Sequence, residues 1–166
     1  MLRPLSAACI SLIVLAGCAS GKYSGPSTNA NSQVTFRASG LQKHAAYPDD
    51  RLVVRIFLGK DDQGTKLGAA PILSADRLSL DVKLDQGVEY TIRFTSFESH
   101  LGGYSSCDVY VPFTPTKDAY KIDYHTRKTD CDAVITRVDQ QGQSSMILAA
   151  SNVAGGTQST GKVIRY

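Results

Sequence analysis

The stretch Leu78–Phe94, "LSLDVKLDQGVEYTIRF", alternates apolar and polar residues on both sides of a short polar link. A period of two is typical of strands that bury one face, so the stretch predicts two strands, over residues 78–84 and 88–94. The link Asp85–Gly87 has hairpin length and contains glycine, and it predicts that the two strands pair with each other. Their buried faces are expected to carry Leu78, Leu80, Val82, Leu84, Val88, Tyr90, Ile92 and Phe94.

Similar short segments recur along residues 33–150, separated by polar turn signals such as Lys60–Gly64, Thr114–Asp118 and Asp139–Gln143. No extended window shows helical periodicity. Many short strands without helices predict an all-β fold, a single antiparallel β-sandwich. The further strands are expected at Gln33–Ser39, Leu52–Leu58, Lys66–Leu73, Ser106–Phe113, Tyr120–His125, Cys131–Val138 and Ser144–Ala149.

The first 17 residues have the layout of a secretory signal peptide. A basic residue, Arg3, precedes the apolar run Ala7–Leu15, and the small pair Ala16-Gly17 follows. The apolar run has roughly half of the ~20 residues that a helix needs to cross a bilayer. The sequence therefore predicts a cleaved signal over residues 1–17 and no permanent transmembrane helix.

The cleavage site lies directly before Cys18, and the sequence Leu15–Cys18, "LAGC", closely resembles the lipobox of bacterial lipoproteins. The resemblance implies that Cys18 is lipidated, becomes the mature N-terminus and anchors the protein to a membrane. The next residues are Ala19 and Ser20, not the Asp that retains such proteins in the inner membrane, so the outer membrane, facing the periplasm, is expected. A plain secretory signal cut elsewhere is the alternative.

The flanks of the expected domain are small and polar. Residues 18–32 contain mainly Gly, Ser, Asn and Pro after the cysteine and predict a flexible tether, and residues 151–166 predict a flexible tail. The formal net charge is only +3, with Lys and Arg scattered among Asp and Glu. No basic stripe is present, so nucleic acid is not an expected partner.

The four cysteines divide by location. Cys9 leaves with the signal and Cys18 takes the lipid, so Cys107 and Cys131 remain. An exported domain with two remaining cysteines is expected to pair them, with two buried free thiols as the alternative. A zinc site would need more His or Cys at close spacing, and only His125 is near, so no metal is expected.

The segment Glu98–Asp108, "ESHLGGYSSCD", holds a carboxylate, a histidine and several hydroxyls. Side chains of one short loop rarely converge into a catalytic arrangement, and no G-x-S-x-G motif is present. We therefore expect no catalytic residues, no enzyme activity and no cofactor.

Recognition is expected in the loop Ser99–Ser106, with His44–Asp50 as a second candidate loop, because binding residues concentrate on loops held by a rigid scaffold. The glycines allow a partner to approach the backbone closely, and His and Tyr are amphipathic side chains that suit interfaces. The residues expected to make contact are His100, Gly102, Gly103 and Tyr104.

The expected sandwich with one disulfide resembles the immunoglobulin-like or transthyretin-like sandwiches of small exported lipoproteins. Antibody domains contain a buried Trp, whereas this chain contains none. The resemblance predicts a non-enzymatic binding or structural module of the cell envelope, with a protein or another envelope component as partner. Arg51–Asp61, "RLVVRIFLGKD", is similar to an early strand of the outer-membrane lipoproteins of type VI secretion systems, which are transthyretin-like sandwiches. A secretion subunit is thus one alternative, and an inhibitor or immunity lipoprotein is another.

Overall fold

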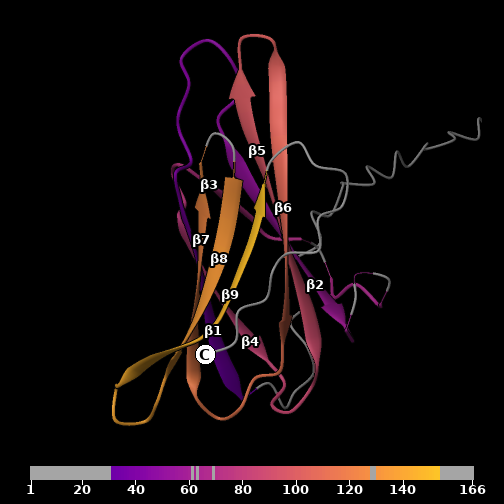
Figure 1. Ribbon diagram of the computed structural model, residues 1–166, viewed down its shortest axis with the longest axis vertical. Helices are drawn as coiled ribbons and strands as arrows, with labels where there is room; N and C mark the ends of the chain where they lie inside the picture. The colour runs from indigo at the N-terminus through magenta and orange to yellow at the C-terminus, as the bar shows by residue number, and fades with distance from the viewer. Residues whose placement is uncertain (1–30, 61, 63, 69, 128–129, 154–166) are drawn as a thin grey trace, which may run out of the picture.

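The computed structural model describes residues 31–60, 62, 64–68, 70–127 and 130–153, which form two β-sheets packed face to face (Figure 1). One sheet has five strands in the order β4-β1-β7-β8-β9, and the other has four in the order β3-β2-β5-β6. The predicted all-β sandwich is confirmed. The strands are β1 (Ser32–Ser39), β2 (Arg51–Leu58), β3 (Ile72–Ser74), β4 (Ser79–Leu84), β5 (Tyr90–His100), β6 (Gly103–Phe113), β7 (Ala119–Thr126), β8 (Asp130–Val138) and β9 (Ser144–Val153).

The predicted signal peptide, Cys18 and most of the tether lie outside the described residues, as does the tail beyond Val153. Ser32, expected in the tether, is instead the first residue of β1; it is fully buried, and its hydroxyl donates to the carbonyl of Thr116. Ser151, expected in the tail, belongs to β9. Within the described part of the chain, no helix is long and apolar enough to span a membrane.

The core lies between the sheets and is built from the alternating apolar rows that the sequence predicts, except that Leu78, expected on a buried face, precedes β4 and is 46% exposed. Tyr90 and Phe94 on β5 are fully buried, as is Phe36 on β1. The Phe94 ring packs edge-on against Phe36 at 5.7 Å and stacks on Tyr124 of β7 at 5.6 Å, measured between ring centroids. Burial of such large aromatic surfaces is the main favourable term that holds two sheets together.

The link Asp85–Gly87 does not form the predicted hairpin. β4 pairs with β1 in one sheet, whereas β5 pairs with β2 and β6 in the other. The link crosses between the sheets, and the Gly87 N–H donates to the carbonyl of Pro115 at 2.8 Å. Alternation predicts which face of a strand is buried but not its neighbour, because strands that face one core from opposite sheets show the same pattern.

The strand expected at Lys66–Leu73 is also wrong in its bounds, since β3 comprises only Ile72–Ser74. Lys66 makes an isolated bridge to Phe57. Between the two segments, Gly68 has a φ of +62° and Pro71 has no N–H to donate. Both residues interrupt a β-ladder, so the edge strand forms only after them.

The disulfide joins Cys107 on β6 to Cys131 on β8, with a Cα–Cα distance of 6.2 Å. Both cysteines are buried, and they belong to different sheets. The predicted pairing is confirmed, and the bridge crosses the core of the sandwich.

The strand connections differ from those of immunoglobulin domains. In immunoglobulin domains the first two strands share a sheet, whereas β1 and β2 lie in different sheets here. β1 runs parallel to β7, and the other described strand pairs are antiparallel. The fold is therefore antiparallel except at the centre of the five-stranded sheet.

Candidate functional site

At one end of the sandwich, the inner row of β5 changes from apolar to polar. Phe94 is followed on the same face by Ser96, Glu98 and His100, because alternate residues of a strand share a face. The hairpin of β5 and β6 and the loop after β1 both reach beyond the ends of β7 and β8 at the upper end of Figure 1. The apolar core therefore ends near Ser96, and a polar surface begins above it.

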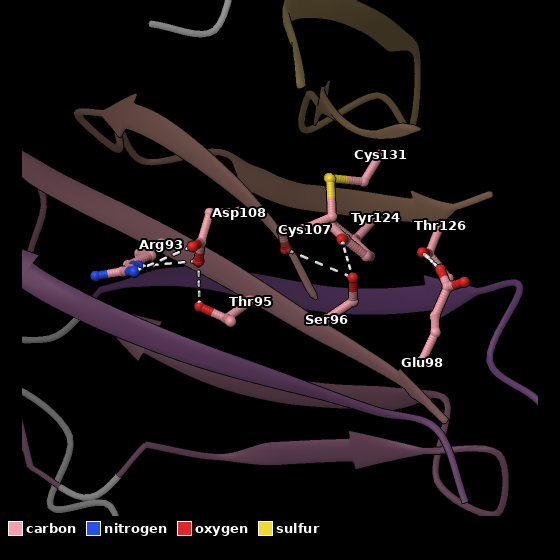
Figure 2. Close-up of a disulfide and its surroundings, with 9 residues drawn as sticks. All are labelled: Arg93, Thr95, Ser96, Glu98, Cys107, Asp108, Tyr124, Thr126 and Cys131. Carbon is pink, nitrogen blue, oxygen red and sulfur yellow. Dashed lines mark hydrogen bonds and ion pairs between the residues drawn. A yellow bond between two sulfur atoms is a disulfide. The ribbon is translucent and has the colours of Figure 1, made fainter. Parts of the chain in front are cut away.

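Ser96, Tyr124 and the disulfide form the last buried layer beneath this surface (Figure 2). The Tyr124 hydroxyl donates to Ser96 Oγ at 2.8 Å, and the Ser96 hydroxyl is 3.5 Å from the carbonyl oxygen of Cys107, which accepts from it. Burial raises the pKa of Tyr124 well above its usual value. Its hydroxyl therefore remains a donor at neutral pH, and this layer is a closed part of the core.

Above this layer, Glu98 and Thr126 connect the two sheets. Thr126, the last residue of β7, donates its hydroxyl to Glu98 Oε1 (Figure 2). On the neighbouring strand, Ser105 of β6 is directly opposite Glu98. These three residues form the floor of an opening between the sheets.

Residues 40–50, here called the 40–50 loop, form one wall of the opening, and Asp50 fixes their position. Its side chain is only 5% exposed. The carboxylate accepts the backbone N–H of Gln42 at 3.0 Å and that of Ser99 at 2.9 Å. His44 Nε2 lies 2.9 Å from the same carboxylate. A buried carboxylate needs such donors in place of water, so this node ties the loop to β5.

Gly40 starts the 40–50 loop at a place that only glycine fits. Its φ is +88°, and a Cβ at this position would lie 2.3 Å from the carbonyl oxygen of Thr126. The backbone can therefore approach the end of β7 closely. Further along the loop, the Tyr47 ring lies against His44, with centroids 4.3 Å apart.

These elements enclose a cleft of about 490 Å³, which we call the end cleft. It lies between the 40–50 loop, the β5–β6 hairpin and the residue after β7, Arg127. Its volume falls in the range of roughly 300–1,000 Å³ that is usual for small-ligand sites. The lining includes Gln42, Tyr47, Glu98, His100, Ser105 and Thr126.

The structure brings the two predicted recognition segments together at this end. His100 and His44 both line the end cleft. Ser99–Ser106 is not the loop that the sequence predicts, however, because residues up to His100 belong to β5 and residues from Gly103 belong to β6. The turn between the strands is short and carries Leu101, which is 95% exposed.

Tyr104, on β6 opposite Ser99, lies on the other face of the β5–β6 hairpin, in a smaller cleft of about 170 Å³. This cleft also contains Arg51 and Phe97. The Arg51 guanidinium lies over the Phe97 ring at 5.0 Å, and the Phe97 and Tyr104 rings meet edge-on at 5.9 Å. Tyr104 is 70% exposed. The predicted residues His100 and Tyr104 therefore line two different clefts rather than one.

Sequence reasoning missed Thr126, Arg127 and Gly40 as parts of the site, since no local pattern connects them to β5. In the sequence, Glu98 was considered only as a member of a possible catalytic group. Its alternation with His100 could have indicated that the two side chains share one face of a strand. The Glu98 carboxylate instead accepts a hydrogen bond from Thr126 across the sheets.

A second polar group lies on the outer face of the four-stranded sheet (Figure 2). Arg93 donates to both oxygens of Asp108, at 3.0 and 3.1 Å, and the Thr95 hydroxyl donates to the same carboxylate at 2.5 Å. Partial burial acts to raise the pKa of Asp108, but the hydrogen bonds from Arg93 and Thr95 outweigh it and hold that pKa below its usual value. The group stabilises pairing between β5 and β6.

Comparison with known proteins finds no family model, no curated protein and no solved structure that matches this chain. A proposal about function therefore depends on the sequence motif at the N-terminus and on the geometry of the end cleft.

Proposed function

We propose that this protein is a lipoprotein of the bacterial cell envelope whose sandwich acts as a non-enzymatic binding module. The sequence "LAGC" at Leu15–Cys18 supports a lipid anchor, because it matches the lipobox pattern directly after an apolar signal. The bridge between Cys107 and Cys131 supports export, because disulfides persist in oxidising compartments. The expected place is the outer membrane, with the domain in the periplasm.

The observation that carries the binding role is the end cleft. Two segments that are far apart in the sequence, the 40–50 loop and the β5–β6 hairpin, form its walls, and Asp50 connects them. Loops positioned by a rigid sandwich are the usual place for recognition.

Capture in living cells tests the binding role. A photo-crosslinking amino acid in place of Gln42, which lines the cleft, should form a defined adduct with an envelope component. His100→Ala should reduce the adduct strongly. The same crosslinker in place of Lys121, exposed on the outer face of β7, is the control and should give none of it. Equal capture from both positions would contradict a site at the end cleft.

The anchor is tested separately by metabolic labelling with radioactive palmitate. Wild-type protein should take up label, and Cys18→Ser should abolish labelling and release the domain from the membrane fraction, because the modified sulfur is lost. Cys9→Ser is the matched control and should retain both the label and the membrane association. Labelling that survives Cys18→Ser would refute the lipoprotein assignment.

One structural observation favours a second candidate, a subunit of a type VI-like secretion machine. Two packed sheets, with β1 between β4 and β7 and β2 between β3 and β5, are compatible with the transthyretin-like sandwich that this candidate implies. The lipoproteins of type VI systems have that architecture, and Arg51–Asp61 resembles one of their early strands. Co-purification of the lipidated protein with inner-membrane components of a secretion complex would support this role, whereas isolation without them would favour the first proposal.

A further inference from the structure

Charged side chains around the end cleft are largely neutralised by neighbours. Asp50 pairs with His44, and Lys43 pairs with Asp76. Arg127 lies 4.0 Å from Asp132, measured from Nη2 to Oδ1. Charged groups of both signs therefore lie at or beside the cleft, and most of them already contact a neighbour of the opposite type.

Several polar groups of the lining have no hydrogen-bond partner within the described part of the chain. They are Glu98 Oε2, the His100 imidazole, the Ser105 hydroxyl and the Gln42 side-chain amide. Together they supply both donors and acceptors, and one of them is a carboxylate oxygen. Such a set suits a ligand with many hydroxyl or amide groups, which also donate and accept.

The cleft also offers an aromatic surface. Tyr47 is half-buried against His44, with ring planes tilted by 32°, so its ring has a fixed position. A fixed aromatic ring gives contact area at a low conformational cost and carries a polar hydroxyl at its edge. A ligand that combines an apolar face with polar groups around its rim would match this wall.

We propose that the end cleft binds a saccharide unit of a cell-envelope glycan. A pyranose ring has C–H faces that can lie on an aromatic ring, and its hydroxyl or acetamido groups can reach Glu98, His100 and Ser105. The cleft volume of about 490 Å³ is sufficient for a small ligand. This inference rests on the proposed binding role and names its ligand class.

Two envelope sources carry such units, and direct binding assays separate them. Purified lipidated protein in detergent is sedimented with intact peptidoglycan sacculi and, in parallel, titrated with lipopolysaccharide-derived core oligosaccharide. One of the two probes should bind saturably. His100→Ala and Glu98→Gln should each weaken that binding by about tenfold, the effect of losing one good hydrogen bond.

His125→Ala is the matched histidine control, because His125 lies on β7 outside the cleft lining and bonds to Ser39. It should bind like the wild type. The inference is wrong if neither glycan binds, or if His100→Ala and Glu98→Gln bind as tightly as His125→Ala while all of them show wild-type unfolding transitions.

Digestion of the adduct captured through residue 42 separates this inference from the proposed function. An adduct that collapses after treatment with a glycan hydrolase supports the saccharide. An adduct that only a protease removes would show that the cleft binds a protein, which overturns the saccharide inference and leaves the binding role standing.

Discussion

The Asp50 side chain is 5% exposed, and it accepts hydrogen bonds from two backbone N–H groups as well as lying 2.9 Å from His44 Nε2. In Asp50→Asn, an NH₂ group would face at least one of these donors and leave it unsatisfied. We expect a loss of about 2–3 kcal/mol in the free energy of unfolding, measured by urea denaturation. Asp49→Asn is the neighbouring control: Asp49 is exposed and accepts one bond, from His44 N–H, so its loss should be about 0.5 kcal/mol. Equal losses would contradict the anchoring role.

Asp108 contributes to the free energy of unfolding in a way that depends on pH. Its folded-state pKa lies below the unfolded value of about 3.9, so its ionised form stabilises the fold above that pH. The contribution is lost as pH falls through the folded pKa. Asp108→Asn should cost about 2 kcal/mol at pH 7 and should flatten the fall in stability below about pH 4. The check is urea denaturation across pH 2–7. Asp81→Asn, which removes an exposed carboxylate on β4, is the control for charge. If stability falls below pH 4 as steeply in Asp108→Asn as in the wild type, Asp108 is not the source of this pH dependence.

The junction between the 40–50 loop and β7 depends on Gly40. Gly40→Ala should destabilise by more than 2 kcal/mol, because the added Cβ would meet the Thr126 carbonyl and φ is +88°. Gly59→Ala separates the two causes, since Gly59 has a φ of +99° but no atom within 4 Å of its Cβ position. It should cost only about 1 kcal/mol. Thermal unfolding compares the two, and equal losses would mean that the close approach does not matter.

The strands also show what the sequence can predict about this fold. Alternation predicted β1, β2, β4, β7 and β8 to within one residue at each end, since a buried row produces that signal directly. It could not predict that β4 and β5 lie in different sheets, because either arrangement buries the same side chains. The site shows the same division: His100 and His44 were found as local features, whereas the contact between Glu98 and Thr126 depends on the sheet topology.

For the whole molecule, the arrangement of the sheets explains why recognition would be at this end. The interior is apolar as far as Phe94 and Tyr124, and the disulfide lies where the interior becomes polar. An opening between sheets would be free to widen if the sheets could shift relative to each other. A covalent bond between β6 and β8 directly below the opening limits that movement, so the cleft can keep its shape without a bound ligand.

The disulfide should therefore affect both stability and the cleft. It closes a loop with a sequence separation of 24 residues, for which the chain-entropy estimate is on the order of 3.5 kcal/mol. The double variant Cys107→Ala/Cys131→Ala leaves no unpaired thiol at this position. Its free energy of unfolding, measured by urea denaturation, should be lower by about 2–5 kcal/mol. Wild-type protein that is reduced while unfolded, then refolded and kept in a reductant, should show a loss of similar direction and size. At urea concentrations below its unfolding midpoint, the double variant should also exchange the Ser105 and Thr126 amides with solvent faster than the wild type. Ser105 lies two residues before Cys107 on β6, and Thr126 is paired with Cys131, so both amides are at the floor of the cleft beside the bridge. A double variant with unchanged stability and unchanged exchange at both amides would show that packing alone sets the distance between the sheets.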